Sequence, residues 1–117
     1  MNRGATTILL VVDDDASLLD VVQVVLEGEG YGVLKALNGE EALRVARAHP
    51  GPIALLLADV VMPGLSGPDV AARLHAIQPG MKVLFVKPFS PETLLSKVRV
   101  MPAYRSPFAR RPEQPSR

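Results

Sequence analysis

The chain has 117 residues and a formal net charge of +1, and 48% of its residues are hydrophobic. This length fits one small domain, and the apolar content excludes a disordered chain. The absence of Cys excludes disulfides, thiolate-bound metals and a thiol nucleophile. Aromatic residues make up only 4%, which disfavours a base-stacking surface for nucleic acids. No apolar run approaches the roughly 18 residues of a membrane span. We therefore expect a cytoplasmic protein without a membrane segment.

Four short and mostly apolar runs predict β-strands. Two of them, TILLVV and IALLLA, are unbroken by polar residues, as in parallel strands buried on both faces. The four runs cover residues 7–12, 31–36, 53–58 and 81–86.

Each strand is followed by a helical pattern. The first has apolar residues spaced by three and four between 18 and 26, and Asn38 with Glu41 marks the start of the second. Pro68 suits the first turn of a third helix, and Ser90-Pro91-Glu92 begins a fourth that runs to about residue 101. Strands alternating with helices predict a doubly wound α/β domain with a parallel sheet.

Acidic residues follow two of the predicted strands. Asp13 and Asp14 end the first strand, and Asp59 ends the third. If these strands are neighbours, the carboxylates meet at the carboxyl edge of the sheet, where either a proton or a hard divalent cation must relieve their repulsion, and oxygen-only ligands favour Mg²⁺. Lys87 follows the fourth strand, so the set suits phosphoryl transfer to an Asp. We expect Asp15 to cap the next helix instead.

Four segments carry a resemblance to a known family. The runs ILLVVDDD, NGEEAL, LLLADVVMPGLSG and VKPFSPETLLSKVR resemble the receiver domain of two-component response regulators, in the variety found at the C-terminus of hybrid sensor histidine kinases. The resemblance covers nearly all of residues 5–101 and implies a flavodoxin-like (CheY-like) fold. It implies a signalling module rather than an enzyme.

The resemblance also implies a role for each site residue. Asp59 would be the phospho-acceptor, and the donor would be a phosphohistidine on a sensor histidine kinase or a histidine phosphotransfer protein. Asp14 would bind Mg²⁺ directly, Asp13 would bind it mainly through water, and the Val61 carbonyl would be a further ligand. Lys87 would contact the phosphoryl group.

The chain departs from the family after residue 80. The family has five strands and five helices, but here the start of the fourth strand, 81–85, runs directly into what resembles the end of the fifth, 86–89. A crossover between parallel strands needs about a dozen residues, and none are available. We expect a sheet truncated to about four strands and four helices, without the switch Ser or Thr of the family and with an impaired output.

Two arrangements of the fused strand are possible. It can occupy the fourth position beside the third strand, or it can exchange between chains. Loss of a helix should expose Val83 and Phe85, so we expect a homodimer, with domain swapping as one route.

The chain divides into a truncated receiver domain, residues 1–101, and a Pro/Arg-rich segment, residues 102–117, for which we expect disorder. The second segment contains four Arg and four Pro. No DNA-binding motif fits after residue 101, so a nucleic-acid partner is not expected.

Two other functions compete with a phospho-accepting receiver. One is a pseudo-receiver that binds proteins or dimerises without carrying phosphate. The other is a phosphatase of the haloacid-dehalogenase type, in which Asp13 of Asp-Asp-Asp-Ala-Ser would be the nucleophile.

Overall fold

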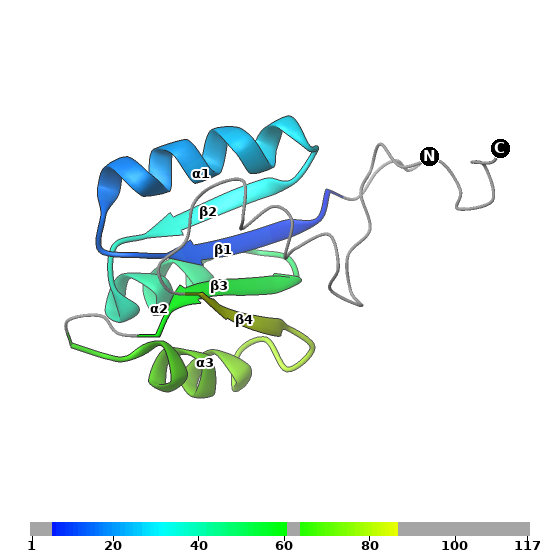
Figure 1. Cartoon of the computed structure of the whole chain (residues 1–117). Helices are drawn as coiled ribbons and strands as arrows, with labels where there is room; N and C mark the ends of the chain where they lie inside the picture. Colours follow the sequence, from blue (N-terminus) through cyan, green and yellow to red (C-terminus); the bar gives the residue numbers. More distant parts are fainter. Residues whose placement is uncertain (1–5, 61–63, 87–117) are drawn as a thin grey trace, which may run out of the picture.

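The computed structural model describes residues 6–60 and 64–86, in which strands and helices alternate without exception (Figure 1). The elements are β1 (Ile8–Val12), α1 (Ala16–Gly28), β2 (Gly32–Ala36), α2 (Gly39–Ala48), β3 (Leu55–Asp59), α3 (Gly67–His75) and β4 (Lys82–Val86). This order confirms the predicted α/β class with four strands. The fourth predicted helix and the segment 102–117 lie outside the described residues. Within the described part, no helix combines the length and apolarity needed to cross a membrane.

The four strands form one parallel sheet in the order β2-β1-β3-β4. The chain adds strands on both sides of β1: β2 lies on one side of β1, and β3 and β4 lie on the other side (Figure 1). This is the flavodoxin-like order expected from the sequence, without a fifth strand in the described part. β4 pairs with β3 of its own chain, with Val86 opposite Asp59. The fused strand therefore takes the place beside the third strand that the first of the two predicted arrangements gave it.

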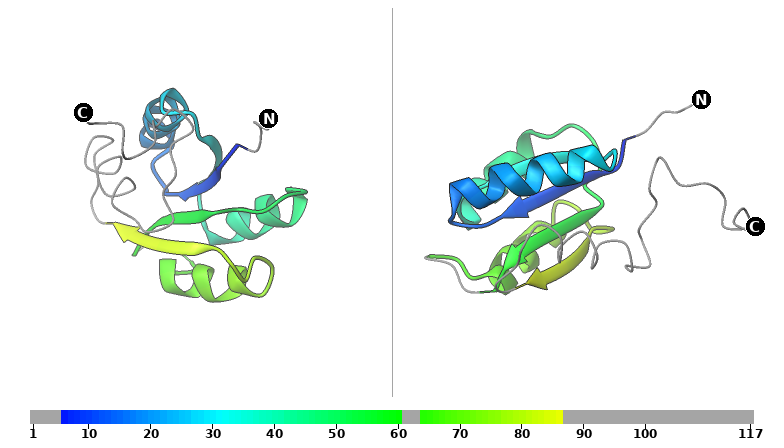
Figure 2. Two further views of the ribbon diagram at one scale, coloured as in Figure 1. Left: turned by 90° about the vertical axis from the view of Figure 1, so that its right-hand side faces the viewer. Right: turned by 45° about the horizontal axis from the view of Figure 1, so that its top comes forward.

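The sheet lies between two helical layers. α1 covers one face, and α2 and α3 cover the other (Figure 2). Successive strand residues point to opposite faces, so Leu9 and Val11 pack in the cluster under α1, while Leu10 and Val12 pack in the cluster under α2 and α3. All four are at most 1% exposed, which explains why the β1 sequence has no polar residue.

Each described helix begins at a side chain that caps it. Asp15, Asn38 and Ser66 each accept a hydrogen bond from the backbone N–H three residues further on. Glu41 also accepts a 2.6 Å bond from the N–H of Leu37, one residue before the cap of α2. The predicted capping-box variant at Asn38 is thus present, with its return bond displaced by one residue.

The predicted strand boundaries differ from the observed ones by one or two residues. The third apolar run begins at Ile53, whereas β3 begins at Leu55. Ile53 is buried, but its N–H donates to the side chain of Gln78 at 3.0 Å, and the Gln78 amide donates to the Gly51 carbonyl. The Gln78 side chain, from the loop after α3, thus binds the backbone at Ile53, where the apolar run predicted a strand.

Gly67 lets the start of α3 approach the end of β3 closely. Its N–H donates to the Val60 carbonyl at 3.1 Å. A Cβ atom at this position would lie 2.5 Å from the backbone oxygen of Asp59 and 3.2 Å from the ring of Phe85. Neither the backbone of β3 nor the ring on β4 can move away without disturbing the sheet edge, so this contact requires glycine.

The substitution Gly67→Ala should lower the free energy of unfolding by roughly 1–3 kcal/mol, because the added methyl group overlaps the Asp59 carbonyl. Gly80→Ala is the matched control, since a Cβ there meets nothing within 4 Å. Urea denaturation of both variants measures the difference. Equal stabilities would contradict the close approach.

Candidate functional site

Three carboxylates meet at the carboxyl end of the sheet. Asp13 and Asp14 directly follow β1, and Asp59 is the last residue of β3. In the parallel register Val12 lies opposite Ala58, so the next residue of each strand reaches the same edge. One oxygen from each of the three carboxylates lies within 4.8 Å of the other two. The predicted convergence of these acids is therefore present.

Backbone hydrogen bonds hold Asp13 in place. Its N–H continues the sheet ladder by donating to the Ala36 carbonyl at 3.1 Å, and the residue is only 5% exposed. Its Oδ1 accepts a 2.8 Å bond from the N–H of Asp15, which fixes the carboxylate orientation. Asp15 itself accepts from the N–H of Leu18 at 3.1 Å, and this confirms its predicted capping role. Three consecutive acids thus have different positions and partners.

The burial of the cluster is graded. Asp13 is buried, Asp59 is half-buried and Asp14 is exposed. This arrangement gives the cluster a closed side at Asp13 and an open side toward solvent at Asp14. A ligand would therefore approach from the Asp14 side.

Burial and the neighbouring acids make the ionised form of Asp13 unfavourable. Burial raises the pKa of Asp13 above its usual range, and this is the largest influence. The hydrogen bond from the Asp15 N–H lowers that pKa, while the negative charges of Asp59 and Asp14 raise it further. The ionised form of Asp13 is thus less favourable in the folded chain than in the unfolded chain.

The donor set fits a hard divalent cation. All three groups are carboxylate oxygens, which Mg²⁺ prefers, and their mutual separation allows one ion to contact them directly or through water. The repulsion that raises the pKa of Asp13 is the interaction that such an ion would relieve. Two other predicted site residues, Val61 and Lys87, lie outside the described residues.

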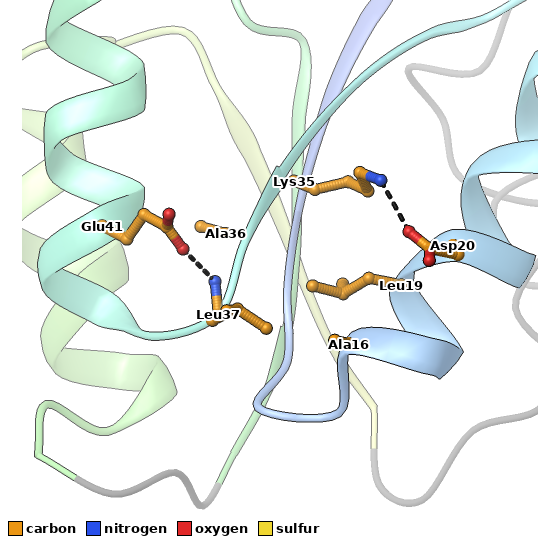
Figure 3. A pocket seen from close by; sticks show the side chains of 7 residues that line it. All are labelled: Ala16, Leu19, Asp20, Lys35, Ala36, Leu37 and Glu41. Atoms are coloured by element: carbon orange, nitrogen blue, oxygen red, sulfur yellow. Dashed lines mark hydrogen bonds and ion pairs between the residues drawn. The ribbon is translucent and has the colours of Figure 1, made fainter.

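A separate open groove of about 230 Å³ lies beside the start of α1 and the end of β2 (Figure 3). None of the three clustered acids lines it. Its charged side chains already bind other groups, because Lys35 forms a 2.8 Å ion pair with Asp20 and Glu41 accepts from the N–H of Leu37. The acid cluster is therefore the better candidate for a functional site.

A parallel sheet with carboxylates at the carboxyl ends of its two central strands defines a doubly wound α/β domain with a cation site where the strand order reverses. The chain belongs to the response regulator receiver domain family, whose profile matches residues 9–93. This confirms the predicted resemblance and favours a receiver over a haloacid-dehalogenase-type phosphatase.

Two curated relatives illustrate the similarity. The chain is 36% identical to the sensor kinase CckA of Brucella abortus over 87 residues, which cover 74% of this chain and 9% of that protein. It is 32% identical to the DNA-binding response regulator MtrA of Mycobacterium tuberculosis H37Rv, over 78% of this chain and 48% of that protein. The chain thus spans about half or less of these relatives' length.

Solved structures of receivers have the same fold. A receiver domain protein (CheY-like) from Methanospirillum hungatei JF-1 has a TM-score of 0.68 at 26% identity, covering 81% of this chain and 92% of its own. The receiver domain of the hybrid histidine kinase CckA has a TM-score of 0.64 at 33% identity, and the match covers 79% of this chain and 95% of that domain's chain. These likenesses confirm the receiver fold class.

Two residues support the site in ways that the sequence patterns did not predict. The Asp15 N–H orients Asp13, and Gly67 packs against the backbone of Asp59. Consecutive Asp residues are a readable signal for the first, because an Asp side chain often accepts from the N–H two residues on. The glycine between Ser66 and Pro68 is a weaker signal, since the close approach depends on α3 packing against β3.

Without divalent cations, the substitution Asp13→Asn should raise the free energy of unfolding at pH 7 by roughly 1 kcal/mol. The amide keeps an acceptor for the Asp15 N–H and removes a buried charge. Since the pKa of Asp13 is raised on folding, the folded state binds that proton more tightly, and stability falls as pH rises through this pKa. Thermal unfolding should therefore show a gain that shrinks toward acidic pH.

The exposed Asp14→Asn variant is the control for this measurement and should gain less. Mg²⁺ should raise the melting temperature of the unsubstituted chain and raise that of Asp13→Asn by less. A variant that is less stable than the unsubstituted chain at neutral pH would contradict the electrostatic account.

Proposed function

We propose that this receiver domain accepts a phosphoryl group on Asp59 in a Mg²⁺-dependent reaction. The donor is a phosphohistidine on a sensor histidine kinase or a histidine phosphotransfer protein. The observation that carries the proposal is the cluster of Asp13, Asp14 and Asp59 within 4.8 Å of one another in a member of the receiver family. The similarity to a sensor kinase supports this class of donor.

Each acid has a distinct role in the proposed reaction. An oxygen of the Asp59 carboxylate attacks the phosphorus, the phosphorus–nitrogen bond to the imidazole breaks, and an acyl phosphate forms on Asp59. Asp14, which is exposed, would hold the cation directly, the buried Asp13 would hold it mainly through water, and the Val61 carbonyl would be a further ligand. Bound Mg²⁺ supplies charge neutralisation for the carboxylates and the phosphoryl oxygens.

Lys87 is the proposed cationic contact of the phosphoryl group. It directly follows Val86, which lies opposite Asp59 in the β3–β4 pairing. The ammonium group would stabilise charge on a phosphoryl oxygen.

The proposed output of this domain is impaired. The alignment with MtrA runs over 112 positions but includes only 78% of this 117-residue chain, so it contains gaps opposite positions that this chain lacks. This supports an internal deletion that removes the switch hydroxyl and one helix of the family. We further propose that the domain is cytoplasmic and works as a phosphoprotein module rather than as an enzyme with steady turnover.

Incubation of the chain with a small phosphodonor such as acetyl phosphate and Mg²⁺ should add one phosphoryl group, detected by intact-protein mass spectrometry. The adduct should be absent in Asp59→Ala and strongly reduced in Asp14→Asn or after chelation of Mg²⁺. Asp20→Asn is the control, because Asp20 pairs with Lys35 outside the cluster and the variant should still be labelled.

The same experiment decides between the proposal and a pseudo-receiver that never carries phosphate. A folded chain that binds Mg²⁺ but acquires no mass would favour the pseudo-receiver. Labelling that persists in Asp59→Ala would assign the phosphoryl group to another residue.

Lys87→Ala should reduce the initial rate of labelling by roughly tenfold or more, because one charge-assisted contact to the phosphoryl group is lost. Lys82→Ala is the matched control, since Lys82 is exposed at the opposite end of β4. Time-resolved mass spectrometry measures both rates. Equal effects of the two substitutions would refute a specific role for Lys87.

A further inference from the structure

β4 forms an open edge of the described sheet. In the described part of the chain it pairs with β3 alone and lies at the end of the strand order (Figures 1 and 2). The Lys82 N–H donates to the Ala54 carbonyl at 2.9 Å, so the backbone groups of Lys82 point toward β3. Because these groups alternate in direction along a strand, those of Val83 and Phe85 point toward the open edge.

The residues at this edge are apolar. Phe85 is 38% exposed, and Val83 is half-buried against the cluster under α2 and α3. Lys82 is the single charged residue of β4, and its backbone groups face β3 rather than the open edge. An edge strand with outward N–H and C=O groups and apolar side chains favours pairing with another strand, and charged residues are the usual protection against it.

The opposite edge of the sheet, at β2, has this protection. The Gly32 N–H donates to the Thr7 carbonyl, so the backbone groups of Val33 and Lys35 face outward there. Lys35 forms an ion pair with Asp20 of α1 beside this edge (Figure 3). The β2 edge thus carries a charged residue whose backbone groups face outward, whereas β4 has no such residue.

We propose that β4 is a homodimer interface, in which the strand pairs antiparallel with β4 of a second copy about a two-fold axis at Leu84. Val83 of each chain then lies opposite the partner's Phe85, and each such pair exchanges both of its backbone hydrogen bonds. This register uses all the outward groups of Val83 and Phe85 on both chains.

The side chains are self-complementary in the same register. Val83 and the partner's Phe85 form cross-strand pairs of the favoured aromatic and β-branched kind. Lys82 lies opposite the partner's Val86, so the two lysines do not meet. A second copy therefore satisfies both the backbone and the side chains of this edge, as an isologous interface requires.

The contact area of a five-residue strand pair is below that of a standard stable interface, so the dimer should form reversibly with rising concentration. The proposal goes beyond phosphoryl acceptance and does not depend on it. Labelling of Asp59 and dimer formation are measured separately, so either can fail alone.

Cysteine cross-linking tests the two-fold axis directly, because the chain contains no Cys. In Leu84→Cys the two thiols would lie on a non-hydrogen-bonded antiparallel pair about 4.5 Å apart at Cα, within the range of a disulfide. Val33→Cys is the control, since Val33 is half-buried against the same cluster as Leu84 but lies on β2. Oxidation by copper phenanthroline in air should link Leu84→Cys and leave Val33→Cys monomeric. Equal linking of both variants, or none at Leu84→Cys, would overturn the proposal.

Sedimentation equilibrium of the full chain over a wide concentration range tests the backbone pairing. Phe85→Pro removes an N–H that faces the edge and not β3, whereas Phe85→Val keeps that N–H in a similar volume. The dimer dissociation constant should rise roughly tenfold or more in Phe85→Pro relative to Phe85→Val, because two intermolecular hydrogen bonds are lost. Circular dichroism checks that both variants fold. A monomer at every concentration, as expected if residues 87–117 cover this edge, would refute the dimer, and so would equal constants for the two variants.

Discussion

The parallel pairing of β1 with β3 is the constraint on which the site depends. Val12 lies opposite Ala58, so Asp13 and Asp59, which are far apart in sequence, must emerge at the same edge. The hydrophobic residues of both strands set this register, because a shift by one residue would turn the buried leucines and valines toward the wrong face. Apolar packing thus forces the negative charges together.

The burial of Asp13 lowers the stability of the domain, but the same acid cluster can bind a cation. Asp13 is buried with one backbone donor, and the neighbouring charges of Asp59 and Asp14 raise its pKa further. A cation bound beside Asp13 would offset this unfavourable charge, so cation binding and folding would be linked. The side-chain caps of the helices and the buried apolar residues of β1 and β3 stabilise the fold around this cluster.

The position of β4 connects the site with the open edge. It occupies the place beside β3 and ends opposite Asp59, so its inner side borders the acid cluster. Its outer side has no neighbour in the described part of the chain and bears Val83 and Phe85. Phe85 also contacts the start of α3 near Gly67, which in turn packs on the Asp59 backbone. The same strand thus supports the candidate site and the proposed interface.

The sequence by itself determined the types of the described elements, the approximate positions of the strands and the candidate acids, because buried parallel strands, helix caps and strand-terminal Asp residues are local patterns. It predicted Asp15 as a cap and Asp59 as a site residue for that reason. Only the tertiary structure decided which strand neighbours β3, which backbone groups face the open edge, and that Gly67 touches Asp59. These features depend on register and packing between segments distant in sequence, and a periodic apolar pattern is compatible with more than one such pairing.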